Sequence, residues 1–378
     1  MRNSFLTELQ VNNFRNLRRV GLKFGSALNL LLGDNGEGKT NLLEAISLSS
    51  SLRTLRACQS NSDLILFGEG SARIASQFSG QHASKIEVHI EVDRKFALLH
   101  NKRVKSARVL AERHPTVSFL PEDTQIIFGS GGSRRRLMDQ VAYAMNPGYI
   151  DTYRNFEQIL LERNKLLKTT HFDALAFQIY NQLYLDQAAL VILDRLQALQ
   201  NIRPFFSAVL LHFSPALSRT QLSYTLKGKS VLDDSKLQAV VIKEKLSAAF
   251  EYCKKIERIR EQTLFGPHLD DLLISFDNNP LRPIASRGQA RVLTLAFKIA
   301  LLQLIKQAQQ SNAMLLLDDV IGELDPSHAR HLFEIVEQLE TQCFITTTHL
   351  SALPNFAKER ARLFEMKALV EARMQSGS

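Results

Sequence analysis

A glycine-rich octapeptide near the start of the chain constrains the fold more than any other feature. It reads Gly-Asp-Asn-Gly-Glu-Gly-Lys-Thr and fits the pattern GxxxxGK[ST]. An apolar run at 27–32 precedes it, and leucine and isoleucine follow at helical spacing from Thr40 to Leu48. Strand, turn and helix in this order predict a phosphate-binding loop lined by backbone N–H groups. The loop consists of Gly33, Asp34, Asn35, Gly36, Glu37, Gly38, Lys39 and Thr40.

Two side chains at the end of this loop have specific expected roles. Lys39 is expected to reach the β- and γ-phosphates of ATP, and the Thr40 hydroxyl is expected to ligate Mg²⁺. The alternative is a chance glycine-rich turn before a helix. The strand–turn–helix context favours the phosphate-binding interpretation.

A second apolar run, 314–317, ends in two carboxylates, Asp318 and Asp319. A strand end of this kind can place Asp318 in the Mg²⁺ shell, directly or through water. Asp319 could then orient or deprotonate an attacking water. Taken alone, the pair could equally be an ordinary acidic turn. The glycine-rich loop elsewhere in the chain makes the Mg²⁺ interpretation the better one.

Two further places could meet a phosphate. The strand pattern at 344–346 leads to His349, which could bond a γ-phosphate or could simply be an exposed histidine. Ser286, Gly288 and Gln289 open a helix expected at 290–305, where Ser286 is a good N-cap. A helix start of this composition also makes a second anion site.

Other local patterns have structural interpretations. Asp325 before Pro326 predicts an N-cap for a helix at 327–339, with a partner-facing loop as the sharper alternative. The run Arg134-Arg135-Arg136 has two interpretations. Pairing of Arg135 and Arg136 with Asp139 on a helix surface is favoured over phosphate contact.

The pattern of apolar residues divides the chain. Strand-like stretches occupy 4–14 and 71–100, whereas helical spacing dominates 134–213 and 236–264, with Pro147 and Pro204 as expected helix boundaries. Mixed α/β pattern returns at about 265. We therefore expect an α/β lobe from 1–128 plus 265–378 and an inserted, mostly helical lobe from 129–264.

Charge and composition narrow the partners. The chain of 378 residues has 47 Lys and Arg against 38 Asp and Glu, a net charge of +9. This excess suggests a polyanionic partner such as nucleic acid or an anionic membrane, or merely a basic cytosolic protein. The sequence lacks an apolar run of about 18 residues, an N-terminal signal pattern and a paired cysteine framework. We expect a soluble protein of a reducing compartment.

In order, these elements resemble an ABC-type P-loop ATPase head, with a mixed or parallel sheet and flanking helices. Phe14-Arg15-Asn16 and the large insertion are similar to the SMC-like branch. Within that branch the chain resembles the RecF family through four stretches, one of which contains the arginine run. The stretches are Ser118–Asp123, Leu161–Asn164, Gly266–Asp270 and Arg134–Asp139 around that run.

The resemblance implies specific roles. Arg15 and Asn16 would contribute to the nucleotide site. Ser286, Gly288 and Gln289 would contact the ATP of a second protomer, so that ATP binding forms a homodimer. Arg287 stands where many ABC-type heads have glycine. Asp319 stands where most SMC proteins and transporters have glutamate, and its side chain is one methylene shorter, which leads us to expect a slow, DNA-stimulated ATPase.

The same resemblance implies a function in recombinational repair, replication and the DNA-damage (SOS) response. The dimer would clamp gapped duplex at single-strand/double-strand junctions and help load RecA with RecR and RecO. We expect a cytoplasmic, nucleoid-associated protein without a membrane partner.

Three other classes compete with this function. A transporter ATPase subunit would carry a shorter insertion, and a small-molecule P-loop kinase would leave the serine turn and His349 unexplained. An SMC-type cohesion protein would need a much longer inserted arm, because a helix advances only about 1.5 Å per residue.

Overall fold

The computed structural model describes residues 4–56, 58–169, 173–227, 230–232, 238–350 and 353–367. The chain divides into two compact units. Unit 1 combines Met1–Asp123 with Ile305–Ser378, and unit 2 comprises Thr124–Leu304. Unit 1 is therefore built from both ends of the chain.

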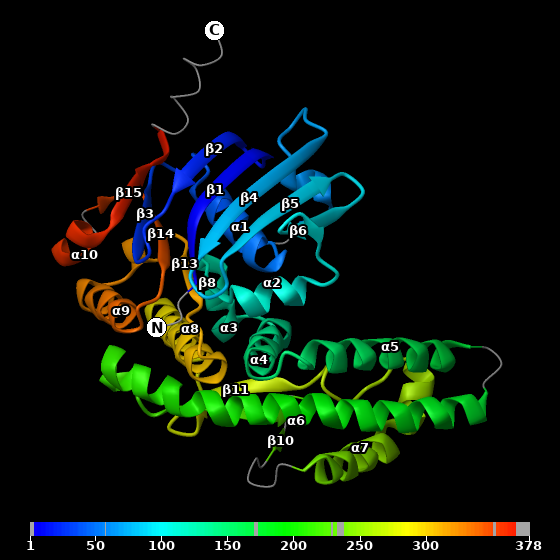
Figure 1. The fold of residues 1–378 in the computed structure, drawn as a ribbon. Coiled ribbons are helices and arrows are strands. Elements are labelled where there is room, and N and C mark those ends of the chain that lie inside the picture. Colours follow the sequence, from blue (N-terminus) through cyan, green and yellow to red (C-terminus); the bar gives the residue numbers. More distant parts are fainter. Residues whose placement is uncertain are drawn as a thin grey trace. The chain divides into compact units, whose positions relative to one another are not determined.

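Unit 1 contains an antiparallel sheet and a parallel sheet (Figure 1). The antiparallel sheet has the strand order β2-β1-β4-β5-β6-β7, and the parallel sheet has the order β15-β3-β14-β13-β8. Their strands are β1 (Phe5–Phe14), β2 (Leu17–Lys23), β3 (Leu28–Leu32), β4 (Ser71–Ser79), β5 (Ser84–Glu91), β6 (Lys95–Leu99), β7 (Lys102–Arg103), β8 (Thr116–Phe119), β13 (Met314–Leu317), β14 (Cys343–Thr347) and β15 (Arg362–Glu365). The helices of unit 1 include α1 (Lys39–Ser51), α2 (Ala107–Arg113), α9 (Pro326–Gln338) and α10 (Asn355–Arg360).

One hydrophobic core joins both sheets around α1. Leu42 and Ile46 of this helix belong to the same buried cluster as Val88 of the antiparallel sheet and Leu316 of the parallel sheet. The residues of β13 and β14 are buried without alternation, which is typical of a parallel strand covered on both faces. In β4 buried and exposed residues alternate instead, as expected for a strand with one face in the core.

The predicted strands at 4–14 and 27–32 and the predicted helix after Thr40 are confirmed as β1, β3 and α1. The strand-like pattern expected over 71–100 includes the alternating residues Ile86, Val88, Ile90 and Val92, but the strand stops before the last of them. β5 ends at Glu91, and Val92 is 62% exposed in the following turn. An alternating pattern alone does not reveal this end because the turn begins without a glycine or proline.

Unit 2 is mostly helical and also carries a small sheet of order β10-β9-β11-β12. Strand β11 pairs antiparallel with β9 along its whole length, from Asp271 to Phe276. The helices are α3 (Gln125–Phe128), α4 (Gly131–Met145), α5 (Tyr149–Lys168), α6 (Ala174–Phe213), α7 (Ala239–Arg260) and α8 (Arg287–Gln309), of which α8 runs on into unit 1. The strands are β9 (Thr220–Leu226), β10 (Ser230–Val231), β11 (Asp271–Phe276) and β12 (Asn279–Pro280).

The second boundary of the helical lobe differs from the expected one. Residues 265–304 were assigned to the α/β lobe with the C-terminal part of the chain, but they belong to unit 2. The physical reason is the pairing of β11 with β9, which ties the strand pattern after 265 to the helical segment. The strand-like sequence pattern after residue 265 predicts a strand but does not predict which sheet that strand joins.

The expectation that Pro204 ends a helix is wrong. Pro204 lies inside the 40-residue helix α6. Proline removes one backbone hydrogen bond and costs about 3 kcal/mol in a helix interior. Ile202 and Phe206 are buried on either side of it, so packing of the same helix face continues past the proline. Pro147 lies between α4 and α5, as predicted.

The arginine run of α4 is held within unit 2. The guanidinium of Arg134 is buried and donates to both carboxylate oxygens of Asp271, each at 2.7 Å. Arg135 donates to the Asp270 carbonyl at 2.9 Å. The structural interpretation of Arg134 and Arg135 therefore holds, but through partners on β11 and the residue before it.

The specific pairing expected with Asp139 is wrong. Asp139 instead accepts hydrogen bonds from Arg195 on α6, at 2.7 Å, and from the Tyr149 hydroxyl. Arg136 donates to Ser133 at 3.2 Å. The Arg195 side chain has no solvent exposure, so its contact with Asp139 is screened less by water than a pair on the exposed helix surface would be.

Helix α8 is long and apolar enough to cross a membrane by length and composition alone, but 78% of its most apolar 18-residue stretch is buried within the fold. Such burial is characteristic of a core helix.

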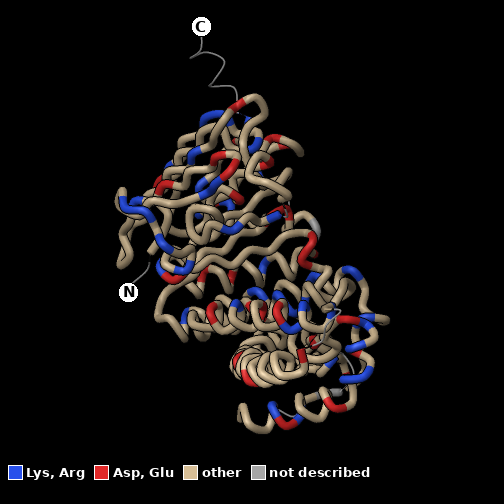
Figure 2. The backbone as a smooth tube through the Cα atoms, turned by 90° about the vertical axis from the view of Figure 1, so that its right-hand side faces the viewer, with Lys and Arg blue, Asp and Glu red and all other residues tan. Residues whose placement is uncertain are grey.

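Figure 2 shows that basic and acidic positions are interspersed along the backbone of both units.

Candidate nucleotide-binding site

Three of the predicted site segments meet at one edge of the parallel sheet. β14 pairs with β3 on one side and with β13 on the other, and all three strands run in the same direction. Their carboxyl ends therefore lie together. Gly33 follows β3, Asp318 follows β13, and His349 comes two residues after β14.

Glycines give the phosphate-binding loop its shape. Gly36 and Gly38 have φ angles of 88° and 92°, in the left-handed region that favours glycine. At Gly38 an added Cβ would also lie 2.7 Å from the Asn16 Oδ1 atom, and at Gly33 it would lie 2.9 Å from the Met366 Cβ atom. Both positions require the absence of a side chain.

The other residues of the phosphate-binding loop close it through a side-chain hydrogen bond and form its exposed tip. The Glu37 carboxylate accepts a hydrogen bond from the Asp34 N–H at 2.9 Å, which closes the loop on itself. Asp34 and Asn35 are exposed. The backbone between them is therefore accessible to a ligand.

Lys39 lies at the first position of α1 and is 6% exposed. Its ammonium donates to the carbonyls of Gly33, at 2.6 Å, and Asp34, at 2.9 Å. These contacts hold the charge inside the curve of the loop. A phosphate bound there would meet both this ammonium and the amino end of α1.

Thr40 and Asp318 come together across 278 residues of sequence. The Thr40 hydroxyl lies 2.9 Å and 2.8 Å from the two carboxylate oxygens of Asp318. Hydroxyl and carboxylate oxygens are the ligands that Mg²⁺ prefers. The donor set thus fits the metal expected from the sequence.

Burial raises the pKa of Asp318 from its ordinary value, and the nearby Asp319 charge adds to this effect. Hydrogen bonds from Thr346 and Thr40 act in the opposite direction because they favour the carboxylate. A divalent cation would stabilise the ionised form further.

Thr346 is a site residue that the sequence did not single out. Its hydroxyl donates to Asp318 Oδ1 at 2.8 Å and accepts the N–H of Asp319 at 2.8 Å. The available signal was a hydroxyl at the end of a strand expected beside the acidic one. The strand order needed to use it was not apparent from the sequence.

Asp319 and His349 lie on the same edge with different surroundings. Asp319 is half-buried and has a φ of 51°, which turns the chain sharply after β13. His349 is exposed, and its N–H bonds the Thr347 hydroxyl at 3.2 Å. Both side chains stand beyond the strand ends that carry the loop and Asp318.

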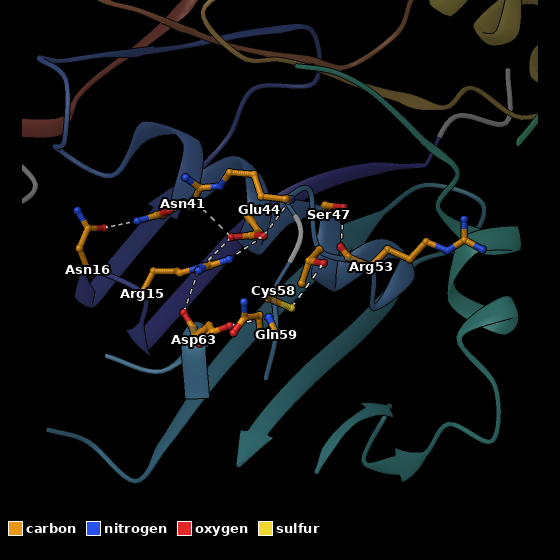
Figure 3. Close-up of polar contacts among 11 residues, drawn as sticks. Arg15, Asn16, Asn41, Glu44, Ser47, Arg53, Cys58, Gln59 and Asp63 are labelled. Atoms are coloured by element: carbon orange, nitrogen blue, oxygen red, sulfur yellow. Dashed lines mark hydrogen bonds and ion pairs between the residues drawn. The ribbon is translucent and has the colours of Figure 1, made fainter. Parts of the chain in front are cut away.

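The pair Arg15 and Asn16 divides between two partners. Asn16 donates from its amide to the Gly36 carbonyl at 2.9 Å, so it contacts the phosphate-binding loop directly. Arg15 donates to Glu44 of α1 at 2.9 Å, and Figure 3 shows this contact beside α1. The structure thus places Arg15 in a contact with protein, and its expected role toward the nucleotide remains a prediction.

The serine turn lies in unit 2, whereas the other predicted site residues lie in unit 1. Ser286 and Gln289 form a reciprocal cap. The Gln289 N–H donates to the Ser286 hydroxyl at 3.1 Å, and the Ser286 N–H donates to the Gln289 side chain at 2.8 Å. All residues from Ser286 to Gln289, Gly288 included, are exposed. The predicted capping role is confirmed, and the turn remains accessible.

Asp325 is confirmed as the N-cap of α9. Its carboxylate accepts the N–H groups of Ser327 at 3.0 Å and His328 at 3.1 Å, with Pro326 at the first helical position. Hydrogen bonds from Ser327 are the first cause of a pKa well below the ordinary value.

Comparison with known proteins places this site in a family. A family model described as the RecF/RecN/SMC N terminal domain matches residues 5–371. The DNA replication and repair protein RecF of Geobacter sp. (strain M21) is 32% identical over 373 residues, covering 96% of this chain and 98% of that protein. RecF of Pediococcus pentosaceus is 30% identical and covers 92% and 93%.

Solved structures give the same picture. A structure of the recombination mediator protein RecF with ATP in the RecFOR pathway has a TM-score of 0.81 at 28% identity, covering 92% of this chain and 94% of that one. An Smc head domain from Pyrococcus furiosus has a TM-score of 0.56 at 15% identity and supports the fold alone. The predicted ABC-type ATPase head is confirmed, and the transporter alternative is not favoured. The chain therefore belongs to the RecF family of DNA replication and repair proteins.

Proposed function

We propose that this protein binds ATP and Mg²⁺ and uses them to control its attachment to DNA during recombinational repair and replication. The observation that carries the proposal is the contact between Thr40 and Asp318 beside the Lys39 ammonium. This constellation would supply a phosphate contact and a hard-oxygen metal site at one sheet edge. The similarity to a RecF structure with ATP supports the same ligand.

Each residue would make a distinct contribution. Lys39 and the loop N–H groups would bind the β- and γ-phosphates, and Thr40 and Asp318 would hold Mg²⁺. Bound Mg²⁺ supplies neutralisation of phosphate charge. Asp319 would orient the attacking water, while His349 would bond the γ-phosphate.

The exposed serine turn supports an ATP-dependent homodimer. Ser286, Gly288 and Gln289 would contact the nucleotide held by a second protomer. The two ATP sites would then close the dimer, and slow hydrolysis would open it. A clamp of this kind suits single-strand/double-strand junctions in gapped DNA, with contacts mainly to phosphates and strong salt dependence.

The RecFOR pathway named for the similar RecF structures supports a place beside RecR and RecO. The clamp would thereby help to load RecA at gaps. Localisation in the cytoplasm, associated with the nucleoid and without a membrane partner, agrees with such a task.

Light scattering tests the core of this proposal. The pure protein is measured without ligand, with Mg²⁺ and ATP, and with ATP plus gapped duplex DNA. We expect the molar mass to double with ATP and the dimer to bind DNA. A protein that stays monomeric with ATP, or a dimer that ignores DNA, would contradict the clamp.

Ser286→Arg should separate nucleotide binding from dimer formation. A bulky cation at an exposed anion site should prevent closure, while ATP affinity of the monomer changes less than about twofold because Ser286 lies outside unit 1. Ser71→Arg adds the same charge at an exposed position of β4 and serves as the control. Normal ATP-dependent dimerisation of Ser286→Arg in light scattering would contradict the composite site.

Asp319→Asn should slow ATP hydrolysis by at least about 100-fold, the lower end of the range expected for a general base. The amide has nearly the same size but does not accept a proton from water, so the closed dimer should persist. Phosphate release and dimer lifetime measure the two effects. Asp93→Asn makes the same change at an exposed position and should behave as the unaltered protein. Unchanged turnover in Asp319→Asn would remove the residue from the reaction.

A further inference from the structure

A continuous chain of polar contacts runs beside the phosphate-binding loop. It joins the turn after β1, the helix α1 and the segment after that helix (Figure 3). Its members are Asn16, Asn41, Arg56, Glu44 and Arg15. Among these side chains, Asn16 is the one that hydrogen-bonds the loop backbone, so the side chains of the others reach that backbone through Asn16.

The first two contacts fix one peptide of the loop. Asn16 donates to the Gly36 carbonyl at 2.9 Å, and Asn41 donates to the Asn16 side-chain oxygen at 2.7 Å. Carbonyl and N–H point in opposite directions in a trans peptide. A fixed Gly36 carbonyl therefore also fixes the direction of the Glu37 N–H, which donates to the Asp34 carbonyl at 3.4 Å and so helps to close the loop around the place where a phosphate would bind.

The far end of the chain is anchored in the core. The Glu44 side chain has no solvent exposure, and its carboxylate receives two hydrogen bonds from Arg15, at 2.9 Å and 3.3 Å. Arg56 lies 3.6 Å from the same carboxylate and also donates to the Asn41 side-chain oxygen. A buried carboxylate without such partners would be strongly destabilising, so both arginines are held near it.

Arg15 uses all three guanidinium nitrogens in these contacts. Two donate to Glu44, and the third donates to the Asp63 carbonyl at 2.9 Å. The residue itself has a φ of 53° in the left-handed region, which turns its side chain and that of Asn16 toward different partners. Within this turn, Arg15 thus contacts the buried Glu44, and the next residue, Asn16, contacts the phosphate-binding loop.

We infer that Asn41 is a positioning residue for the nucleotide, anchored by Arg56 and Glu44 and acting through Asn16 on the Gly36–Glu37 peptide. This inference rests on the proposed ATP site. It assigns to polar residues of α1 a role in orienting the loop backbone, which the glycine-rich sequence pattern does not predict. Asn41 itself contacts the Asn16 and Arg56 side chains, not the loop backbone.

A double-mutant cycle on Asn16 and Asn41 tests the inference, because two groups that act in series are not additive. ATP affinity with Mg²⁺ is measured by titration calorimetry for the unaltered protein, Asn16→Ala, Asn41→Ala and the double variant. We expect each single variant to bind ATP about tenfold more weakly and the double variant to be no weaker than Asn16→Ala. The KM for ATP should rise while kcat changes less than about twofold.

Asn12→Ala is the matched control, since Asn12 is half-buried on the strand that leads into the same turn. It should leave ATP affinity unchanged. Melting temperatures of all variants should agree within a few degrees, which separates positioning from loss of fold.

The outcomes distinguish this inference from the proposed function. If the unaltered protein does not bind ATP, the proposed nucleotide site fails. If it binds ATP and Asn41→Ala binds equally well, the positioning role fails while the site stands. Additive losses in the double variant would also overturn the inference, because Asn41 would then act by a route other than Asn16.

Discussion

Replacement of Lys39 by alanine is expected to lower ATP affinity by at least about 100-fold and to abolish ATP-dependent dimerisation and DNA binding together. Hydrogen bonds to charged groups contribute about 1.5–3 kcal/mol each, and 1.4 kcal/mol corresponds to a factor of ten. An ammonium that meets two phosphates therefore accounts for a loss of this size. The ammonium already lies inside the loop, bonded to the Gly33 and Asp34 carbonyls.

Titration with a fluorescent ATP analogue and light scattering measure the two effects. Lys23→Ala removes the same charge from an exposed position of β2 and should leave both unchanged. A Lys39→Ala protein that still dimerises with ATP would place the nucleotide elsewhere. Loss of fold is checked by the melting temperature, which should stay close to that of Lys23→Ala.

Glu257→Ala is expected to produce the largest loss of stability. Glu257 and Arg163 form an ion pair at 2.7 Å in unit 2, and neither side chain is exposed. Arg163 also donates to Thr263 at 2.6 Å and Asn181 at 3.0 Å. Removal of one partner leaves a buried charge without compensation, which costs about 3–5 kcal/mol.

Aromatic rings surround this ion pair, and they cannot compensate for the lost carboxylate. The Arg163 guanidinium carbon lies 5.0–5.6 Å from the ring centroids of Phe177, Tyr184, Phe250 and Phe265. Aromatic rings attract the cation but do not replace a carboxylate that also accepts the Leu264 N–H at 2.7 Å. Loss of Glu257 thus affects both the charge and a backbone donor.

Urea unfolding followed by far-UV circular dichroism measures the free energy of unfolding. Glu162→Ala is the matched control, because it breaks an exposed pair with Lys165 on the helix that carries Arg163. Exposed pairs contribute about 0–1 kcal/mol. The double variant Arg163→Met, Glu257→Leu should be more stable than Glu257→Ala alone, since it removes both charges. Equal effects of Glu257→Ala and Glu162→Ala would contradict the prediction.

The features that could be predicted from the sequence depend on neighbouring residues. The strand, loop and helix around Lys39 are contiguous, as are the cap at Asp325 and the strand that ends at Asp318. Each follows from local spacing and the chemistry of glycine, proline and short polar side chains. The family resemblance supplied the relation between the distant motifs.

The features that were missed depend on contacts between distant segments. Thr346 holds Asp318 only because β14 lies beside β13, and Asp139 pairs with Arg195 only because α4 packs on α6. Pro204 does not end α6 because burial on both sides outweighs its local cost. The pattern of a single sequence does not identify which distant residues become neighbours in the fold.

The turn at Asp319 also has a consequence for the side-chain entropy of this carboxylate. The backbone there is in the left-handed region, and Thr346 holds its N–H. An aspartate at this position has one fewer rotatable bond than a glutamate, so less side-chain freedom is lost when its carboxylate is aimed. The shorter aspartate side chain extends less far from the backbone than a glutamate would. The direction of its carboxylate is therefore set mainly by the backbone conformation at Asp319 and by the hydrogen bond from its N–H to Thr346.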